Sequence, residues 1–123
     1  MGDSNLAGRT ILIVEPQIAQ FVYDLQGALE QMGAETLIAR EPADAFERMK
    51  SFSFSACVIN YDHASDALHA FIGDLGRVPV LLYGGAGASV ASTQVVRHLA
   101  FAHATVGSIV SDLCRLLSRP KTK

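Results

Sequence analysis

The stretch Ala56–Asp62, ACVINYD, decides how the rest of this sequence is interpreted. Its first four residues are apolar, and Val58 and Ile59 are β-branched, which is typical of a strand buried on both faces of a parallel sheet. The run ends at Asn60, and a carboxylate follows only at Asp62. The stretch therefore predicts a buried strand that presents an amide, rather than a carboxylate, where the strand ends.

Strands and helices are predicted to alternate along the rest of the chain. Further strands are expected at Thr10–Val14, Glu35–Ala39, Val78–Tyr83 and around Phe101–Ala102. Apolar residues recur at helical spacing between and after these strands, which predicts helices over 18–32, 42–49, 65–75, 90–99 and 109–117. Alternation of this kind predicts a parallel sheet with helices on both of its faces.

The length and composition fit one folded domain. The chain has 123 residues and half of them are hydrophobic, which predicts a single domain over 1–123, with a core at about 9–117 and a basic tail at 118–123. In an open parallel sheet, functional side chains lie beyond the carboxyl ends of the strands, near the point where the strand order reverses. Candidate site residues are therefore sought at those ends.

Charge and apolar patterning exclude several classes of partner. The net charge is -2 and the basic residues are scattered, so no nucleic-acid surface is expected. No apolar run approaches the roughly 20 residues that span a bilayer, and no signal peptide is indicated. Cys57 and Cys114 stand among apolar residues without metal-binding spacing, which favours core thiols in a reducing, cytoplasmic compartment.

The strand ends lack the motifs of common catalytic and nucleotide-binding sites. No glycine follows the first strand, where Glu15 and Pro16 stand, so neither a dinucleotide fingerprint nor a P-loop is present. The four histidines lack zinc-ligand spacing, and there is no GxSxG sequence. The glycine-rich segment 84–89, which ends at a potential helix-capping Ser89, fits a flexible loop better than a phosphate cradle. The sequence therefore does not predict an enzyme.

Five segments in order carry a family resemblance. They are ILIVEP, a helical segment ending LEQMGAE, DAFERM, ACVINYD and VPVLLYGG. Together they resemble a response-regulator receiver domain of the CheY type, from about Arg9 to Leu117. The resemblance implies a flavodoxin-like (βα)5 three-layer sandwich whose five-stranded parallel sheet has the order 2-1-3-4-5. It also implies a phosphoacceptor aspartate after the third strand, Mg²⁺ held by acids after the first, and a Ser/Thr and a Lys after the fourth and fifth.

The residues that this resemblance places at the phosphorylation site are altered. The phosphoacceptor position is Asn60, whose amide cannot form an acyl phosphate, and Pro16 follows Glu15 where a second acid is expected. The Ser/Thr position falls on Gly84. The Lys position falls on Ala102, or on His103 in a register shifted by one, and the chain's lysines are Lys50, Lys121 and Lys123. The sequence is therefore similar to a degenerate receiver, or pseudo-receiver.

The leading hypothesis is a receiver-like module in two-component or phosphorelay signalling that acts by protein–protein interaction without phosphorylation and needs no cofactor. Its partner would be a histidine kinase, a regulator or an effector. In receivers the output surface is the fourth helix, fifth strand and fifth helix, which here correspond to 90–101 and 108–117. Apolar residues along the last helix and a mean hydropathy of +0.27 favour an interface there, including a homodimer.

Two alternatives stay open. In the first, Asp62 is a substitute phosphoacceptor that receives a phosphoryl group from a histidine kinase. Asp62 and Glu15 would then form an acidic-pocket remnant that binds Mg²⁺ weakly. Otherwise Asp62 is a loop carboxylate that caps the helix starting near Ser65. The second alternative is a small-ligand sensor that uses a cleft between Glu15, Asn60 and Gly84. A ligand that binds only the folded state would raise the melting temperature.

Overall fold

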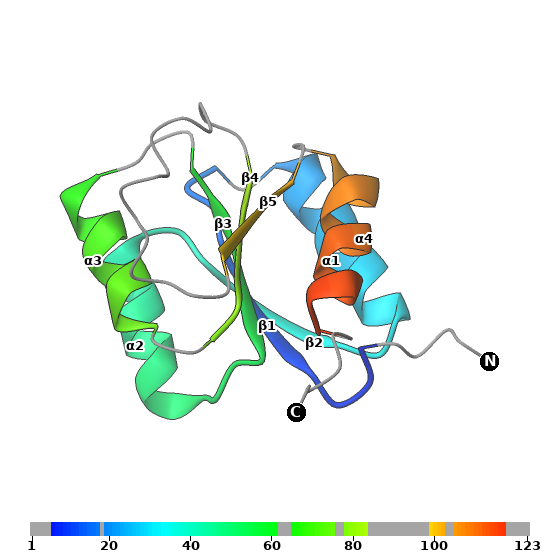
Figure 1. Cartoon of the computed structure of the whole chain (residues 1–123), viewed down its shortest axis with the longest axis horizontal. Helices are drawn as coiled ribbons and strands as arrows, with labels where there is room; N and C mark the ends of the chain where they lie inside the picture. The colour runs from blue at the N-terminus through cyan, green and yellow to red at the C-terminus, as the bar shows by residue number, and fades with distance from the viewer. Residues whose placement is uncertain are drawn as a thin grey trace.

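The computed structural model describes residues 6–17, 19–61, 65–75, 78–83, 99–102 and 105–117. Five strands are present in these residues: β1 (Thr10–Val14), β2 (Glu35–Ala39), β3 (Ala56–Asn60), β4 (Val80–Tyr83) and β5 (Leu99–Ala102). The helices there are α1 (Gln20–Gln31), α2 (Pro42–Ser51), α3 (Asp66–Asp74) and α4 (Val106–Leu117). Figure 1 shows the sheet between two helical layers.

The strands form one parallel sheet in the order β2-β1-β3-β4-β5. The chain runs from β1 outward to β2 and then returns past β1 to β3, so the strand order reverses between β1 and β3. Both strands are buried along almost their whole length, as expected for a sheet covered on both faces. The flavodoxin-like fold class predicted from the sequence is confirmed.

The sheet separates two hydrophobic clusters. Helices α1 and α4 cover one face and α2 and α3 cover the other (Figure 1). Alternate residues of each central strand point to opposite faces, so Ile13 and Val58 pack with α1 and α4, whereas Leu12 and Ile59 pack with α2 and α3. The alternation matters for the carboxyl edge, because it assigns each strand-end side chain to one layer or the other.

One predicted boundary is wrong at the last strand. The sequence placed Leu99 at the end of a helix over 90–99, but Leu99 begins β5, where it pairs with Val80 in the parallel ladder. The remainder of that predicted helix, 90–98, lies outside the described residues. The last helix begins at Val106 and carries the apolar residues that the sequence predicted for it. The Thr105 side chain accepts a hydrogen bond from the Ser108 amide at its start.

The folded core begins earlier than the predicted boundary at Arg9. Leu6 is completely buried in the cluster beneath α1 and α4, and its amide donates to the Met32 carbonyl at 3.0 Å. Gly33 ends α1 with a φ of +98°, and a Cβ there would lie 2.8 Å from the Ala7 Cα. The segment before β1 is therefore seated on the turn between α1 and β2, where only glycine fits.

The cap of α3 also differs from the prediction. The Ser65 Oγ accepts a hydrogen bond from the Leu68 amide at 3.1 Å, so Ser65 is the N-cap residue. Asp62, which the sequence offered as the capping carboxylate, lies outside the described residues. The helix thus starts where the sequence predicted it to start, but it is capped by a different side chain.

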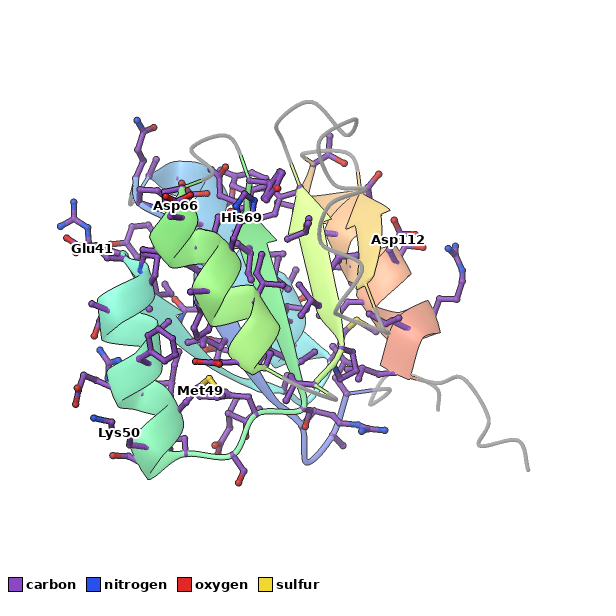
Figure 2. All side chains as sticks on the ribbon, turned by 60° about the vertical axis from the view of Figure 1, so that its left-hand side comes forward. Glu41, Met49, Lys50, Asp66, His69 and Asp112 are labelled. Carbon is purple, nitrogen blue, oxygen red and sulfur yellow. The ribbon has the colours of Figure 1, made fainter. Side chains whose placement is uncertain are left out.

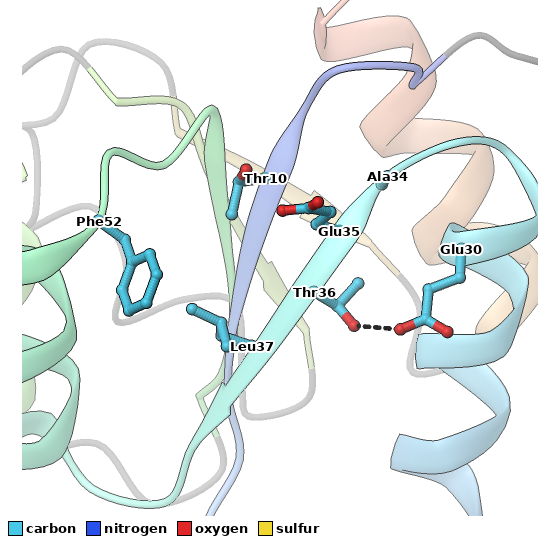
Figure 3. Close-up of a pocket in the computed structure, with 7 residues that line it drawn as sticks. All are labelled: Thr10, Glu30, Ala34, Glu35, Thr36, Leu37 and Phe52. Atoms are coloured by element: carbon cyan, nitrogen blue, oxygen red, sulfur yellow. Dashed lines mark hydrogen bonds between the residues drawn. The ribbon is translucent and has the colours of Figure 1, made fainter.

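An open pocket of about 330 Å³ lies along the outer edge of the sheet at β2 (Figure 3). It is lined by Thr10, Glu30, Ala34, Glu35, Thr36, Leu37 and Phe52. The Thr36 hydroxyl donates to the Glu30 carboxylate at 3.0 Å across its rim. The pocket lies at the start of β2, away from the carboxyl edge where parallel sheets carry their sites.

Within the described residues, no helix is both long and apolar enough to cross a bilayer.

Candidate functional site

The carboxyl ends of β1, β3 and β4 bring three polar side chains together. Asn60 pairs with Tyr83 in the sheet register, and Val14 pairs with Ile59, so Glu15 lies level with Asn60. Successive side chains of a strand point to opposite faces of the sheet, and this alternation places all three side chains on the face covered by α1 and α4. We refer to these residues as the Glu15–Asn60–Tyr83 cluster.

Glu15 is the acceptor at the centre of this cluster. It is only 4% exposed, and its backbone amide continues the sheet by donating to the Ala39 carbonyl at 2.9 Å. Its Oε1 accepts hydrogen bonds from the Asn60 Nδ2, at 2.9 Å, and from the Tyr83 hydroxyl. Its Oε2 accepts from the Asn60 Nδ2 at 3.0 Å and from the Gln17 amide at 3.1 Å. Four contacts from three donors therefore fill the roughly four acceptor positions of a carboxylate.

The Asn60 amide is oriented by this carboxylate. Its Nδ2 lies within hydrogen-bond distance of both Glu15 oxygens, and the reverse orientation would set a carbonyl oxygen against them. An aspartate at position 60 would create the same conflict with an added charge. The Asn60 amide thus stabilises the Glu15 carboxylate by donating hydrogen bonds to it. A second carboxylate at position 60 could not do this without a cation or a proton between the two groups.

The described residues do not fit a magnesium site. Mg²⁺ takes oxygen ligands in near-octahedral geometry, and receiver chemistry relies on several acids around it. At this edge, Glu15 faces N–H and O–H donors instead, and the described part of the chain holds no group of three or more acids, histidines or cysteines that could bind a metal. The weak Glu15–Asp62 site predicted from the sequence needs Asp62, which lies outside the described residues.

The other predicted site positions are only partly described. Gly84 and His103 lie outside the described residues. Ala102 ends β5 and pairs with Tyr83, so positions 60, 83 and 102 form one row across β3, β4 and β5. The structure thus places the backbone of the predicted lysine position beside the cluster, and the residue there carries no charge.

A second polar pair lies on the opposite face of the same edge. Tyr61 is 2% exposed, and its hydroxyl lies 2.6 Å from the His69 Nε2 on α3. Figure 2 shows His69 on the turn of α3 nearest this edge, one turn after Asp66. Consecutive residues at the end of β3 therefore connect to different layers, Asn60 toward α1 and Tyr61 toward α3.

A small open pocket of about 200 Å³ adjoins the cluster. It is lined by Glu15, Gln17, Ala19, Phe21, Val22, Asn60 and Tyr83. The Phe21 and Tyr83 rings form part of its wall, with centroids 5.6 Å apart and planes tilted by 50°. The pocket lies at Glu15 and Asn60, with the start of α1 as its other side. Gly84, the third residue of the predicted cleft, lies outside the described residues.

Solved structures identify the fold. The chemotaxis response regulator CheY4 of Vibrio cholerae matches with a TM-score of 0.72 at 15% identity, covering 89% of this chain and 98% of that chain. The chain has the receiver-domain fold. The receiver domain of a signal transduction histidine kinase from Syntrophus aciditrophicus gives 0.70 at 22% identity, covering 94% and 97%. A response regulator receiver protein from Sinorhizobium medicae gives 0.69 at 16% identity, covering 90% and 95%.

The similarity to receiver domains is found by comparing structures. No family model matches the sequence, and no curated protein sequence matches it. The alternation of apolar residues in the strands and helices determines the packing, so the fold does not depend on the residues at the strand ends.

Two contacts of the cluster do not follow from the sequence pattern. The pattern predicts Tyr83 as a strand residue and points to Gly84 after it as the site position. The Gln17 contact is made by a backbone amide, which carries no sequence signal. The available clue was parity: Tyr83 lies two residues after the buried Leu81, so its hydroxyl belongs to the same face as Asn60 once the register is known.

Proposed function

We propose that this chain is a receiver-like signalling module that binds protein partners without being phosphorylated and without catalysing a reaction. The observation that supports this most directly is the Glu15–Asn60 contact. At the position where a receiver carries its phosphoacceptor, an amide donates to the neighbouring acid at 2.9 and 3.0 Å. An amide is a poor nucleophile, so this side chain does not supply the attacking carboxylate oxygen that phosphoryl transfer to a receiver needs.

The receiver fold supports a partner-binding role in two-component signalling. Proteins of this fold exchange signals through helical faces, and here the face proposed for partners comprises 90–101 and 108–117. Of this face, the structure describes β5 and most of α4. The apolar side chains Ile109 and Leu113 are buried in the core, while Leu116 and Leu117 stay half-buried at the end of the helix. We assign the partner contact to this end of α4.

Incubation with a small-molecule phosphodonor and Mg²⁺, followed by intact-mass spectrometry, tests the proposal. The expected result is an unchanged mass for the natural chain. Asn60→Asp serves as the comparison, because it restores a carboxylate at the acceptor position. A labile mass gain in the natural chain that is lost in Asp62→Asn would contradict the proposal and establish the alternative, a regulator phosphorylated on Asp62 with Mg²⁺.

A further inference from the structure

The last turn of α4 is held by a side chain from the segment before β1. The Arg9 Nη2 donates to the Leu117 carbonyl at 3.3 Å, across 108 positions of sequence. The last carbonyls of an α-helix have no N–H partner within the helix, and a cation near them offsets the negative end of the helix dipole. Figure 1 shows this end of α4 beside the segment that leads into β1. Arg9 therefore supplies a donor that the helix itself does not provide for this carbonyl.

The contact described for the basic residue of α4 is directed away from the helix end. Arg115 lies in the last turn, but its Nη1 donates to the Asp112 Oδ1 at 2.9 Å, one turn back along the helix. The Arg115 side chain is 75% exposed, so this ion pair contributes little to stability. Arg9 is half-buried, and a hydrogen bond from a charged donor is stronger where water is partly excluded. Of these two arginines, Arg9 is the one whose described contact reaches the helix end.

The backbone of Arg9 is fixed on both sides. Its amide donates to the Leu6 carbonyl at 3.0 Å, and its carbonyl accepts from the Glu35 amide at 2.9 Å, at the start of β2. Leu6 is completely buried, and the turn passes through Gly8, whose φ of +79° favours glycine. A side chain on a backbone held in this way needs less ordering to form its hydrogen bond. The turn 6–9 therefore presents the guanidinium to α4 from a rigid base.

The helical turn that Arg9 holds carries two leucines with different surroundings. Leu117 packs against the hydrophobic cluster beneath α1 and α4, whereas Leu116 packs against neither cluster of the described residues. Both side chains are half-buried. Consecutive residues of a helix point about 100° apart, so a fixed Leu117 also fixes the direction of its neighbour. Leu116 is thus the apolar side chain that this turn offers to a partner.

We propose that Arg9 is a positioning residue for the partner surface: by holding the Leu117 carbonyl it fixes the last turn of α4, and with it the direction of the Leu116 side chain. This role rests on the proposed function, which assigns the partner contact to the end of α4, and the partner to be tested is a second copy of the chain. Without the guanidinium the last turn frays, and part of the binding free energy is spent on ordering it again.

NMR of the full chain, at a concentration that keeps it monomeric, tests whether Arg9 holds the turn. In Arg9→Gln the Cα shifts of Leu116 and Leu117 should move toward coil values, because the ratio of ordered to frayed turn falls about three- to tenfold. Those of Leu25 and Leu29 in α1 should stay constant. Arg9→Lys keeps a cation at the helix end and should recover most of the order. Unchanged α4 shifts, or equal changes in α1, would overturn the proposal.

Arg40→Gln is the matched control. Arg40 also donates its guanidinium to a backbone carbonyl, that of Pro16 at 3.4 and 3.5 Å, but it follows β2 at the opposite edge of the sheet. The substitution removes the same charge and should leave the Leu116 and Leu117 shifts unchanged. Changes in α4 as large as those of Arg9→Gln would show an effect of net charge alone and would overturn the proposal.

Sedimentation equilibrium measures the effect on binding separately. The dimer dissociation constant should rise in Arg9→Gln with the inverse square of the ordered population, because each copy contributes one turn. It should stay near the natural value in Arg9→Lys and Arg40→Gln. A frayed turn with an unchanged dissociation constant would overturn the role of Arg9 at the partner surface. A natural chain that is monomeric at every concentration would instead contradict the proposed function, while the Cα shifts still decide whether Arg9 holds the turn.

Discussion

Asn60 sets the chemistry of the carboxyl edge because it donates to a buried acid. Glu15 is held by the Asn60 amide, the Tyr83 hydroxyl and the Gln17 backbone, so its acceptor capacity is used within the protein. A receiver that receives a phosphoryl group needs the opposite arrangement, with acids that attract a metal and an oxygen that attacks phosphorus. At the scale of residues, the amide of Asn60 is one of several differences between the two arrangements, beside Pro16, Gly84 and Ala102.

Asn60→Asp should destabilise the protein in the absence of metal. The new carboxylate would face both Glu15 oxygens at the present contact distances of 2.9 and 3.0 Å, replacing donation by repulsion. We expect the free energy of unfolding to fall by about 1–3 kcal/mol at neutral pH, and Mg²⁺ to restore part of it by bridging the two acids. Urea denaturation with and without MgCl2 measures both effects.

Ser53→Asp is the control for this change, because it adds one negative charge at an exposed position between α2 and β3. It should alter stability by less than about 0.5 kcal/mol and should not respond to Mg²⁺. Equal behaviour of the two variants would mean that the Glu15–Asn60 contact contributes nothing to the fold.

Tyr83→Phe should also be destabilising. The substitution removes the hydroxyl that donates to the Glu15 Oε1 while it keeps the ring against Phe21. Loss of a donor to a buried charged group costs about 1–3 kcal/mol. Tyr23→Phe is the matched control, since Tyr23 is 53% exposed and should change the denaturation midpoint little. A Tyr83→Phe variant as stable as Tyr23→Phe would refute the role assigned to the hydroxyl.

At the scale of elements, the turn between α1 and β2 depends on one glycine. Gly33 has a φ of +98°, and an added Cβ would meet the Ala7 backbone at 2.8 Å. Gly33→Ala should therefore lower the free energy of unfolding by at least about 1–2 kcal/mol, through the left-handed backbone alone. Gly27→Ala, within α1 and with nothing within 4 Å of its Cβ, should instead stabilise the protein by up to about 1 kcal/mol.

Thermal unfolding of the two glycine variants side by side measures this difference. Because both variants add one methyl group to the same helix–turn unit, opposite shifts in melting temperature would reflect the left-handed backbone and the close Ala7 contact at position 33. Shifts of the same sign would contradict the assigned turn geometry.

Strand β3 carries a thiol that should react only on unfolding. Cys57 is completely buried, and burial raises its pKa from 9.0 to about 12. The thiolate is the reactive form, so iodoacetamide should modify Cys57 at the rate at which the protein unfolds. The half-buried Cys114, whose pKa is raised by burial as well, should react first in the native protein. Mass spectrometry over time, with Cys114→Ser to isolate Cys57, separates the two.

The same thiol makes stability depend on alkaline pH. Because the pKa of Cys57 is higher in the folded protein than the ordinary 9.0, the folded state binds more protons between about pH 9 and 12. The associated stability is fully present below pH 9 and is lost as the pH rises through that window. Cys57→Ala should weaken this alkaline dependence when unfolding is measured at several pH values.

The elements were largely predictable, whereas the site was only partly so. The alternation of apolar strands such as Thr10–Val14 with amphipathic helices is a local pattern, and β1, β2 and α2 begin or end where that pattern predicts. The prediction for Leu99 is wrong because a leucine that follows apolar residues at helical spacing fits both the last turn of a helix and the first residue of a strand. Glu15 and Asn60 were found because they follow strands directly, but their hydrogen bonds depend on register and parity that only the assembled sheet defines.

At the scale of the whole molecule, two layers share one sheet edge. The end of β3 sends Asn60 to the α1 layer and Tyr61 to the α3 layer, where they contact Glu15 and His69 respectively. Changes at this strand end therefore affect both hydrophobic clusters. The proposed partner face comprises β5 and α4 together with residues 90–98, which lie outside the described residues.

Homodimerisation through that face is the prediction for the assembly. Light scattering at high protein concentration should show a dimer, and Leu116→Glu, which places a charge on the half-buried end of α4, should shift it toward the monomer. Tyr23→Glu introduces the same charge at an exposed position on α1 and should leave the dimer intact. A strictly monomeric natural chain would contradict the prediction.

The outer edge of β2 limits how such molecules associate. As a terminal strand, β2 has backbone groups without a neighbouring strand on one side, which is the usual starting point for aggregation. It is only five residues long, and the exposed charges of Glu35 and Arg40 stand at its beginning and just after its end (Figure 3 shows Glu35). Another chain that extended the sheet at β2 would have to fit between these charges, so the fold resists fibril-like growth at this edge.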